Sequence, residues 1–298
     1  GSMESVSFDT LTFDHPTACR PARISATLHI PADRPEPAPC MVILTSSAGV
    51  QRHREHYYAD LLNAAGAAAL IVDSFRSRGV RRTVADQSLV SAAQMEGDAF
   101  AALALLRADR RIDPSRIGIM GVSKGGVATL NAALAVRQRW RRDFPHLFDI
   151  HVALCPGATA QHRDATTHGR PMFFMLAARD DYTPAELAIE YAERMRAAGN
   201  DRIKVKVYGG AHHGWESLGP VFDIKDAENW SCCRNIIEDD GRHFVPSLGQ
   251  ALDEPEFQAW ARQHCVTRGA RAGGGTADLK QRASADLIAF LAVHGFVR

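Results

Sequence analysis

A serine flanked by glycines is the feature of this chain with the clearest chemical potential. The segment Gly121-Val122-Ser123-Lys124-Gly125-Gly126 follows the apolar run Ile117–Met120 and precedes apolar residues at helical spacing. A tight turn between a strand and a helix holds such a serine in strained backbone geometry and raises its hydroxyl above the sheet. The amide of Lys124, at the start of the helix, can donate a hydrogen bond to an oxyanion. The pattern therefore predicts that Ser123 is a nucleophile.

A serine hydroxyl needs a base to take its proton, and two later segments supply an acid and a histidine. Asp180 and Asp181 follow one apolar run, and His212 and His213 follow the next. The order serine, acid, histidine is the one expected after a nucleophile elbow. Asp180 is the favoured acid because it lies nearer the end of its strand. The residues alone leave both histidines open as the base.

Short apolar runs without alternation provide the strands that must position these residues, as expected when a sheet is covered on both faces. The runs are Met41–Leu44, Ala68–Val72, Ile117–Met120, His151–Leu154 and Met172–Leu176, and Ile203–Tyr208 supplies another strand. Apolar residues at helical spacing lie between these runs, so strands and helices alternate. The sequence predicts an α/β fold with a mostly parallel, doubly wound sheet and helices on both faces.

The remaining segments predict elements at the borders of this sheet. Val6–Phe13 and Arg23–Ile30 are expected to form an N-terminal antiparallel hairpin at a sheet edge. The proline-rich segment Pro31–Pro39 is expected to be a surface connection. Thr183-Pro184-Ala185-Glu186 has the pattern of a capping box and predicts the start of a helix.

The C-terminal third changes character. Periodicity disappears between about residues 216 and 275, which we interpret as an irregular excursion, and it resumes in a closing helix around Leu287. We interpret the excursion as part of one domain rather than as a second domain. The single domain is expected to cover residues 3–298, because Gly1 and Ser2 resemble the remnant of a cleaved tag. The sequence leaves open whether the excursion forms a lid, a contact in a homodimer, or both.

Composition excludes several classes of partner. Lys and Arg number 35 against 34 for Asp and Glu, so neither nucleic acid nor an anionic membrane is an expected partner. No apolar run is long enough to cross a bilayer and no export signal precedes the fold, which predicts a soluble, cytoplasmic protein. The cysteines show no metal-binding spacing, and acyl transfer through a serine requires no metal or organic cofactor, so neither is expected. Free buried thiols are favoured over a disulfide between Cys232 or Cys233 and Cys265.

Several of these segments match the motifs of a known family. They are Val42–Gly49, Val72–Gly79, the elbow around Ser123, the Asp180-Asp181-x-x-Pro184 turn and the loop Gly210-Ala211-x-His213-Gly214-Trp215. Through them the chain resembles the dienelactone hydrolase branch of the α/β-hydrolases, over about residues 20–215 and the last helix. The resemblance implies the α/β-hydrolase fold.

The resemblance also implies a role for each matching residue. Ser123 is expected to be the nucleophile, Asp180 the acid and His213 the base. The backbone amides of Lys124 and Ser47 are expected to form the oxyanion hole. The best-known members carry cysteine where this chain has Ser123, so the enol-lactone specificity of that branch does not transfer to it.

Three other residues are candidates for substrate contacts. Arg76 and Arg78 follow a strand at the catalytic edge, where they could hold a carboxylate through paired hydrogen bonds, and Trp215 could line a pocket. We expect a serine hydrolase that cleaves a small-molecule ester, lactone or thioester through an acyl-enzyme. The alternatives are an acyltransferase or thioesterase that uses the same residues, and a non-catalytic binding protein on the same scaffold.

Overall fold

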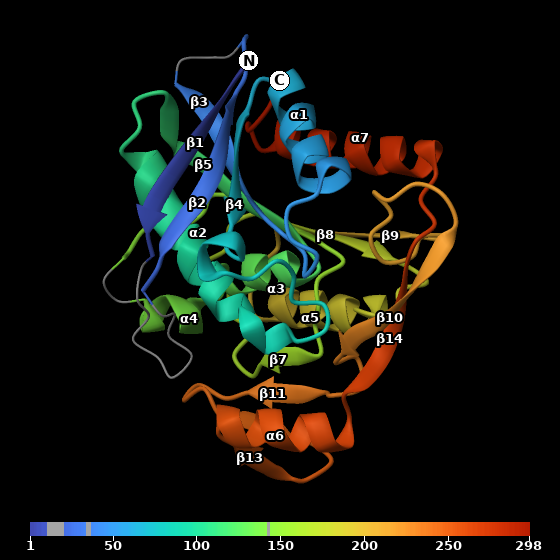
Figure 1. Cartoon of the computed structure of the whole chain (residues 1–298). Helices are drawn as coiled ribbons and strands as arrows, with labels where there is room; N and C mark the ends of the chain where they lie inside the picture. The colour runs from blue at the N-terminus through green and yellow to red at the C-terminus, as the bar shows by residue number, and fades with distance from the viewer. Residues whose placement is uncertain (11–20, 34–36, 142–143) are drawn as a thin grey trace.

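A mostly parallel sheet forms the centre of the computed structural model, which describes residues 1–10, 21–33, 37–141 and 144–298 (Figure 1). In spatial order its strands are β1 (Ser2–Asp9), β2 (Arg23–Ile30), β4 (Ala68–Asp73), β3 (Ala38–Leu44), β5 (Ile112–Val122), β6 (His151–Leu154), β8 (Met172–Ala177) and β9 (Ile203–Tyr208). Strand β2 runs antiparallel to both of its neighbours, and the pairs from β4 to β9 are parallel. The predicted fold class is confirmed.

The N-terminal hairpin is present with different bounds. Strand β1 begins at Ser2, which pairs with Ile30, although we expected this residue to be a tag remnant outside the fold. The end of the predicted first strand, residues 11–13, lies outside the described residues. Pro39 was expected in a surface connection and instead lies within buried β3.

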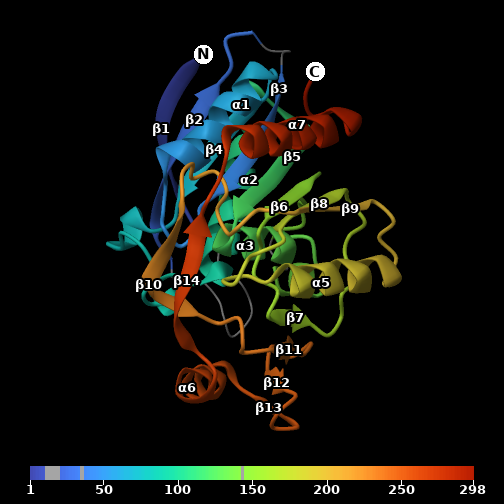
Figure 2. The same cartoon turned by 90° about the vertical axis from the view of Figure 1, so that its right-hand side faces the viewer.

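Helices cover both faces of the sheet (Figures 1 and 2). Along β3, Val42 packs with α2 and Ile43 packs with α1 and α7, because successive side chains of a strand point to opposite faces. This two-sided burial explains the apolar runs without alternation. The helices are η1 (Arg52–His56), α1 (Tyr57–Ala64), η2 (Arg76–Arg78), η3 (Gln87–Leu89), α2 (Ala92–Arg107), α3 (Lys124–Asn131), α4 (Ala135–Trp140), α5 (Ala185–Ala197), α6 (Glu254–His264) and α7 (Ala277–Val293). Within the described ranges, none of them has both the length and the apolar character needed to span a bilayer.

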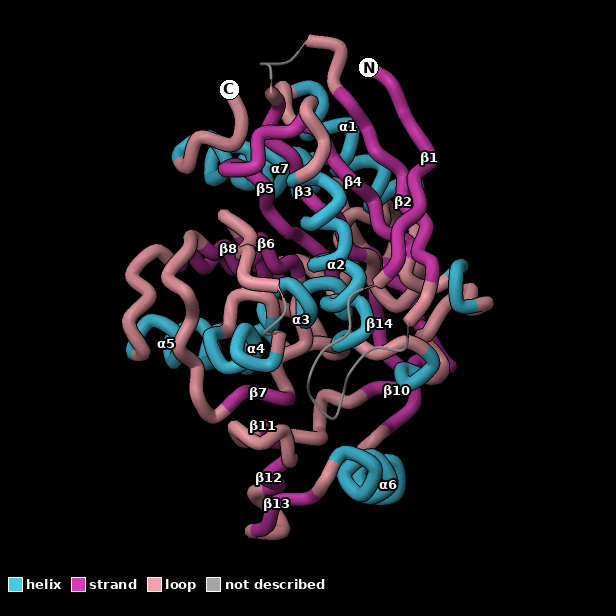
Figure 3. Tube along the Cα trace, turned by 90° about the vertical axis from the view of Figure 1, so that its left-hand side faces the viewer, coloured by secondary structure: helices cyan, strands magenta, loops and turns pink. Residues whose placement is uncertain are grey.

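The expected irregular excursion is instead an ordered substructure, and we refer to residues 216–275 as the cap. Strands β10 (Val221–Asn229) and β14 (Thr267–Gly273) pair antiparallel, with a register shift between Ile224 and Glu228. The short strands β11 (Asn235–Ile237), β12 (His243–Val245) and β13 (Gln250–Leu252) extend a small sheet from β7 (Ala160–His162). Figure 3 shows this sheet and α6 at the end of the molecule opposite the two termini. Strands this short carry no periodicity that a sequence pattern could reveal.

A disulfide closes the cap. Cys233, after β10, is bonded to Cys265, at the end of α6, with an S–S distance of 2.13 Å. The expectation of free thiols is therefore wrong for this pair. Cys40 and Cys155 are buried free thiols, and Cys232 is exposed.

Candidate active site

Ser123 occupies the single position between β5 and α3. Its φ of 59° and ψ of −111° place it in a left-handed region that non-glycine residues rarely adopt. A Cβ on Gly121 would lie 2.4 Å from the carbonyl carbon of Gly125, and one on Gly125 would lie 2.6 Å from the oxygen of Thr45. The glycines are therefore required for α3 to pack so closely on the sheet. The result is the sharp turn that the motif predicts, with Ser123 at the carboxyl end of β5.

An acid and a base meet in the loops after β8 and β9, at the same carboxyl edge of the sheet as Ser123. Nδ1 of His213, in the loop after β9, lies 2.8 Å from Oδ2 of Asp180, in the loop after β8, and both side chains are buried. The amides of Tyr182 and Thr183 donate to Oδ1 of Asp180 at 2.9 and 2.7 Å. Burial alone would raise the pKa of Asp180, but its attraction to His213 and these hydrogen bonds outweigh burial and hold the pKa below its ordinary value. Asp180 is therefore ready to orient an imidazole as a carboxylate.

The neighbouring acid is engaged elsewhere. Asp181 is exposed and accepts hydrogen bonds from the amide and Nε of Arg271, at 2.9 and 3.3 Å. This contact attaches the loop after β8 to β14 of the cap. Of the alternatives that the residues left open, the structure brings Asp180 and His213 together.

Thr183 has a position that the sequence analysis did not anticipate. Its hydroxyl lies 2.9 Å from Oδ2 of Asp180 and 2.9 Å from Nδ1 of His213, and it donates to the carbonyl of Cys155 at 2.9 Å. The predicted capping box is wrong, because α5 has Pro184 as its N-cap and receives no side-chain hydrogen bond there. The hydroxyl that would have capped the helix belongs to the acid–base pair.

Cys155 also borders this pair. Its thiol, the Asp180 carboxylate and the His213 ring have potential ligand atoms within 4.8 Å of one another, the one such group found within the described ranges. Asp180 already accepts two amides and contacts His213, so its oxygens are committed to orienting the imidazole. This arrangement is typical of an acid–base pair.

A cavity of about 420 Å³ opens at Ser123 and extends beneath the cap. Ser47 and Lys124, which carry the amides expected to bind an oxyanion, line it beside Ser123. Its apolar wall comes from both the body and the cap, through Val127, Trp140, Trp230, Ile237 and Phe257. The cap therefore supplies part of the space in which a substrate of Ser123 would lie.

The predicted substrate contacts are not found there. Arg78 forms two hydrogen bonds to the buried carboxylate of Asp98, at 2.7 and 2.9 Å, and Arg76 is exposed. Trp215 is buried in the core, with its ring 5.1 Å from that of Tyr208. None of the three predicted residues lines the cavity at Ser123. Arg78 and Trp215 are held by partners in other elements, which the local sequence could not reveal, and a substrate contact of the exposed Arg76 stays a prediction.

Comparisons with known proteins identify the family of this chain. The family model described as "Dienelactone hydrolase family" matches residues 24–229. Protein usf from Aquifex pyrophilus is 30% identical over 125 residues, a match that spans 41% of this chain and half of that protein. Esterase 2 from Thermogutta terrifontis phosphoramylated by tabun has a TM-score of 0.63 at 16% identity, covering 99% of this chain and 96% of its own.

The butyrate-bound structure of the thermophilic Thermogutta terrifontis esterase has a TM-score of 0.59 at 16% identity, with coverage of 92% and 90%. At such low identity these structures support the fold, whereas the family model covers most of the chain itself. The chain belongs to the dienelactone hydrolase family and has the α/β-hydrolase fold.

Proposed function

We propose that the protein is a serine hydrolase that cleaves a carboxylic ester, lactone or thioester through an acyl-enzyme on Ser123. His213 takes the Ser123 proton, and the serine oxygen attacks the carbonyl carbon. The amides of Ser47 and Lys124 stabilise the oxyanion, and His213 returns the proton to the leaving group. Water then hydrolyses the acyl-enzyme by the same steps. The observation that carries the proposal is the 2.8 Å contact between His213 Nδ1 and Asp180, at the same carboxyl edge of the sheet as the strained Ser123 turn.

Labelling with a fluorophosphonate tests this proposal. The similar esterase from Thermogutta terrifontis is phosphoramylated by tabun, which makes an organophosphorus probe the natural choice. We expect one label per chain, found on Ser123 by mass spectrometry of the digested protein. The Ser88→Ala variant is a matched control, because Ser88 lines the same cavity and contacts neither Asp180 nor His213. A folded protein that takes no label, or takes it on another residue, would refute the assignment.

The charged groups of the cavity favour an uncharged substrate. Arg137 donates from Nε to Glu96 at 2.8 Å, and Glu228 accepts from Arg262 at 2.8 Å, so both charges have protein partners. Burial lowers the pKa of Lys124 to about 7. Burial likewise lowers the pKa of His243, another lining residue, to about 4, and raises that of the lining Glu254. A carboxylate placed in this cavity would therefore find little free positive charge.

Matched ester substrates are expected to reveal this preference. For 4-nitrophenyl esters with arms of equal length, an uncharged arm should give a kcat/KM roughly a hundredfold above that of an arm ending in a carboxylate, since an unpaired buried charge costs about 3 kcal/mol. The ratio of the two kcat/KM values should decrease as the pH falls below 7, because Lys124 then gains its proton and its positive charge. Equal kcat/KM values at pH 8 would contradict the prediction.

A further inference from the structure

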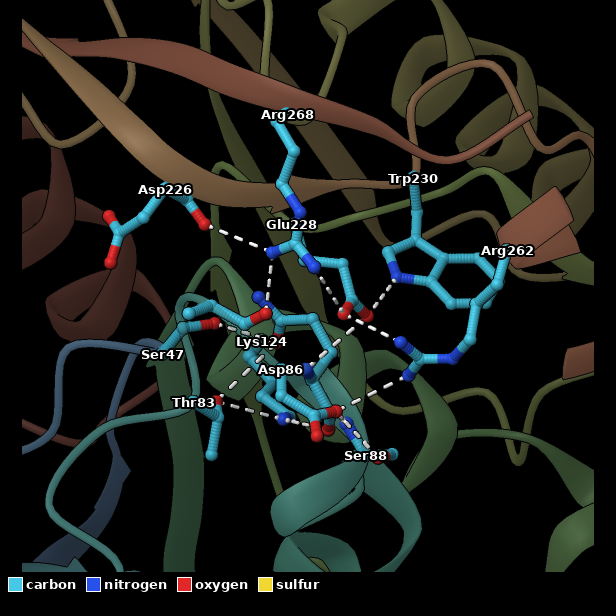
Figure 4. Close-up of polar contacts among 12 residues, drawn as sticks. Ser47, Thr83, Asp86, Ser88, Lys124, Asp226, Glu228, Trp230, Arg262 and Arg268 are labelled. Atoms are coloured by element: carbon cyan, nitrogen blue, oxygen red, sulfur yellow. Dashed lines mark hydrogen bonds and ion pairs between the residues drawn. The ribbon is translucent and has the colours of Figure 1, made fainter. Parts of the chain in front are cut away.

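Gln87, the first residue of η3, bonds to several separate parts of the site. Its Oε1 accepts from the Ser47 hydroxyl at 2.9 Å, and its Nε2 donates to the Tyr182 hydroxyl at 3.2 Å. Its carbonyl accepts from Nζ of Lys124 at 2.7 Å, and its amide donates to Glu228 at 3.3 Å. Figure 4 shows Ser47, Lys124 and Glu228 gathered in one polar cluster. Both the side chain and the backbone of Gln87 thus act as links.

The partners of Gln87 belong to both halves of the proposed machinery. Ser47 and Lys124 carry the amides assigned to the oxyanion hole. The Tyr182 ring lies 4.9 Å from the ring of His213, centroid to centroid, and the Tyr182 amide donates to Asp180 at 2.9 Å. One side chain therefore fixes the oxyanion loop relative to the loop that carries the acid.

Glu228, the residue of the cap that accepts from the Gln87 amide, is itself held by several partners. The Glu228 side chain is fully buried, and its carboxylate accepts from Arg262 and from the indole of Trp230, each at 2.8 Å. Arg268 approaches the same carboxylate at 3.9 Å, and the Glu228 amide donates to the carbonyl of Val84 at 2.8 Å. In Figure 4 Trp230 and Arg262 approach Glu228 from the same side of the cluster. The position of the segment around Gln87 thus depends on both body and cap.

We propose that Gln87 is a positioning residue for ester cleavage. Its side chain holds the Ser47 loop and the Tyr182–His213 contact in the arrangement that stabilises the oxyanion. Glu228 of the cap, in turn, holds Gln87 in place. The inference rests on the proposed function. An oxyanion hole works because its donors are fixed before the charge forms, so a small displacement raises the barrier without weakening substrate binding. A carboxamide can accept from one hydroxyl and donate to another at once, which an apolar side chain of equal length cannot do.

One substitution at position 87 separates this role from simple packing. Gln87→Met keeps the length and loses both side-chain hydrogen bonds. We expect kcat for 4-nitrophenyl butyrate to fall by roughly 10- to 100-fold with KM within about twofold, since the lost interaction matters only in the transition state. The affinity for a trifluoromethyl ketone, whose adduct carries an oxyanion, should fall by the same factor, and that for the matching alcohol should not change.

Ser47→Ala removes one arm of the link and provides a milder second variant. It should lower kcat by several-fold. The double variant with Gln87→Met should have the same kcat as Gln87→Met alone, because both substitutions remove the contact between Ser47 and Gln87. Gln161→Met is the matched control, since Gln161 is a buried glutamine outside the cavity that donates to the carbonyls of Ala158 and Leu187. It should lower thermal stability and leave kcat unchanged.

The outcomes distinguish the inference from the function on which it rests. Wild-type kcat in Gln87→Met, an unchanged affinity of Gln87→Met for the trifluoromethyl ketone, or additive losses in the double variant would each overturn the role of Gln87. A wild-type protein that neither hydrolyses 4-nitrophenyl butyrate nor reacts with the fluorophosphonate would instead overturn the proposed hydrolase.

Discussion

Ser123→Ala is expected to lower kcat/KM for 4-nitrophenyl butyrate by about 10⁵-fold, because without the nucleophile only binding and the oxyanion hole remain to assist attack by water. The fold should persist, since alanine occupies less space and Ser123 caps no helix through its side chain. The rate should be measured with purified protein at saturating and limiting substrate. Circular dichroism and the melting temperature would confirm that the variant is folded.

Two further variants at this position sharpen the interpretation. Ser123→Gly should be equally inactive but more stable by about 1 kcal/mol, because glycine relieves the cost of the positive φ. Ser88→Ala, in the same cavity, should retain activity within about twofold of wild type. If Ser123→Ala kept a tenth of the wild-type rate, the acyl-enzyme mechanism would have to be abandoned.

Asp180→Asn is expected to lower kcat by about 10³- to 10⁴-fold with little effect on KM. The amide group of asparagine can donate to His213 Nδ1 and so favour the tautomer in which Nε2 carries the proton and cannot take one from Ser123. The pKa of Asp180 is held below its ordinary value, so the wild-type carboxylate stays charged across the neutral range and the effect should not depend on pH there.

Asp181→Asn is the matched control for the adjacent carboxylate. It weakens only the exposed contact to Arg271, so activity should remain within about threefold of wild type. Similar losses in Asp180→Asn and Asp181→Asn would mean that the contact between Asp180 and His213 is structural. Thermal denaturation of both variants would show whether the loss of activity follows a loss of stability.

The parts of the fold that could be predicted are those whose signal is local. The strand from Ile117 to Met120 and the closing helix around Leu287 appear in the sequence because burial imposes a composition and a period on neighbouring residues. The elbow at Ser123 has a local signal as well, since Gly121 is required by its close approach to Gly125, four residues later.

The parts that were missed depend on partners distant in sequence. Arg78 was predicted to bind a substrate because its partner Asp98 lies in a later helix. The role of Gln87 could not be predicted, because it links two residues that are distant in sequence, Ser47 and Tyr182. Thr183 carried the signal of a helix cap, but the buried Asp180 competes for the same hydroxyl. No period or motif encodes which of two possible partners a polar group takes, and packing decides it.

The Cys233–Cys265 disulfide means that the cap and the proposed catalytic residues respond differently to the redox conditions. The crosslink, between residues 32 positions apart, encloses β11, β12, β13 and α6 and restricts this loop by roughly 3–4 kcal/mol in a chain-entropy estimate. Such bonds persist in oxidising compartments and are rare in the cytosol, so a cytoplasmic location, which stays a prediction, would imply a reduced and looser cap. A reducing thiol in the buffer would cleave this disulfide and loosen the cap, which forms one wall of the cavity at Ser123, while Ser123 and His213 would stay in place. Two preparations of one polypeptide, stored with and without dithiothreitol, would then differ in which esters they prefer.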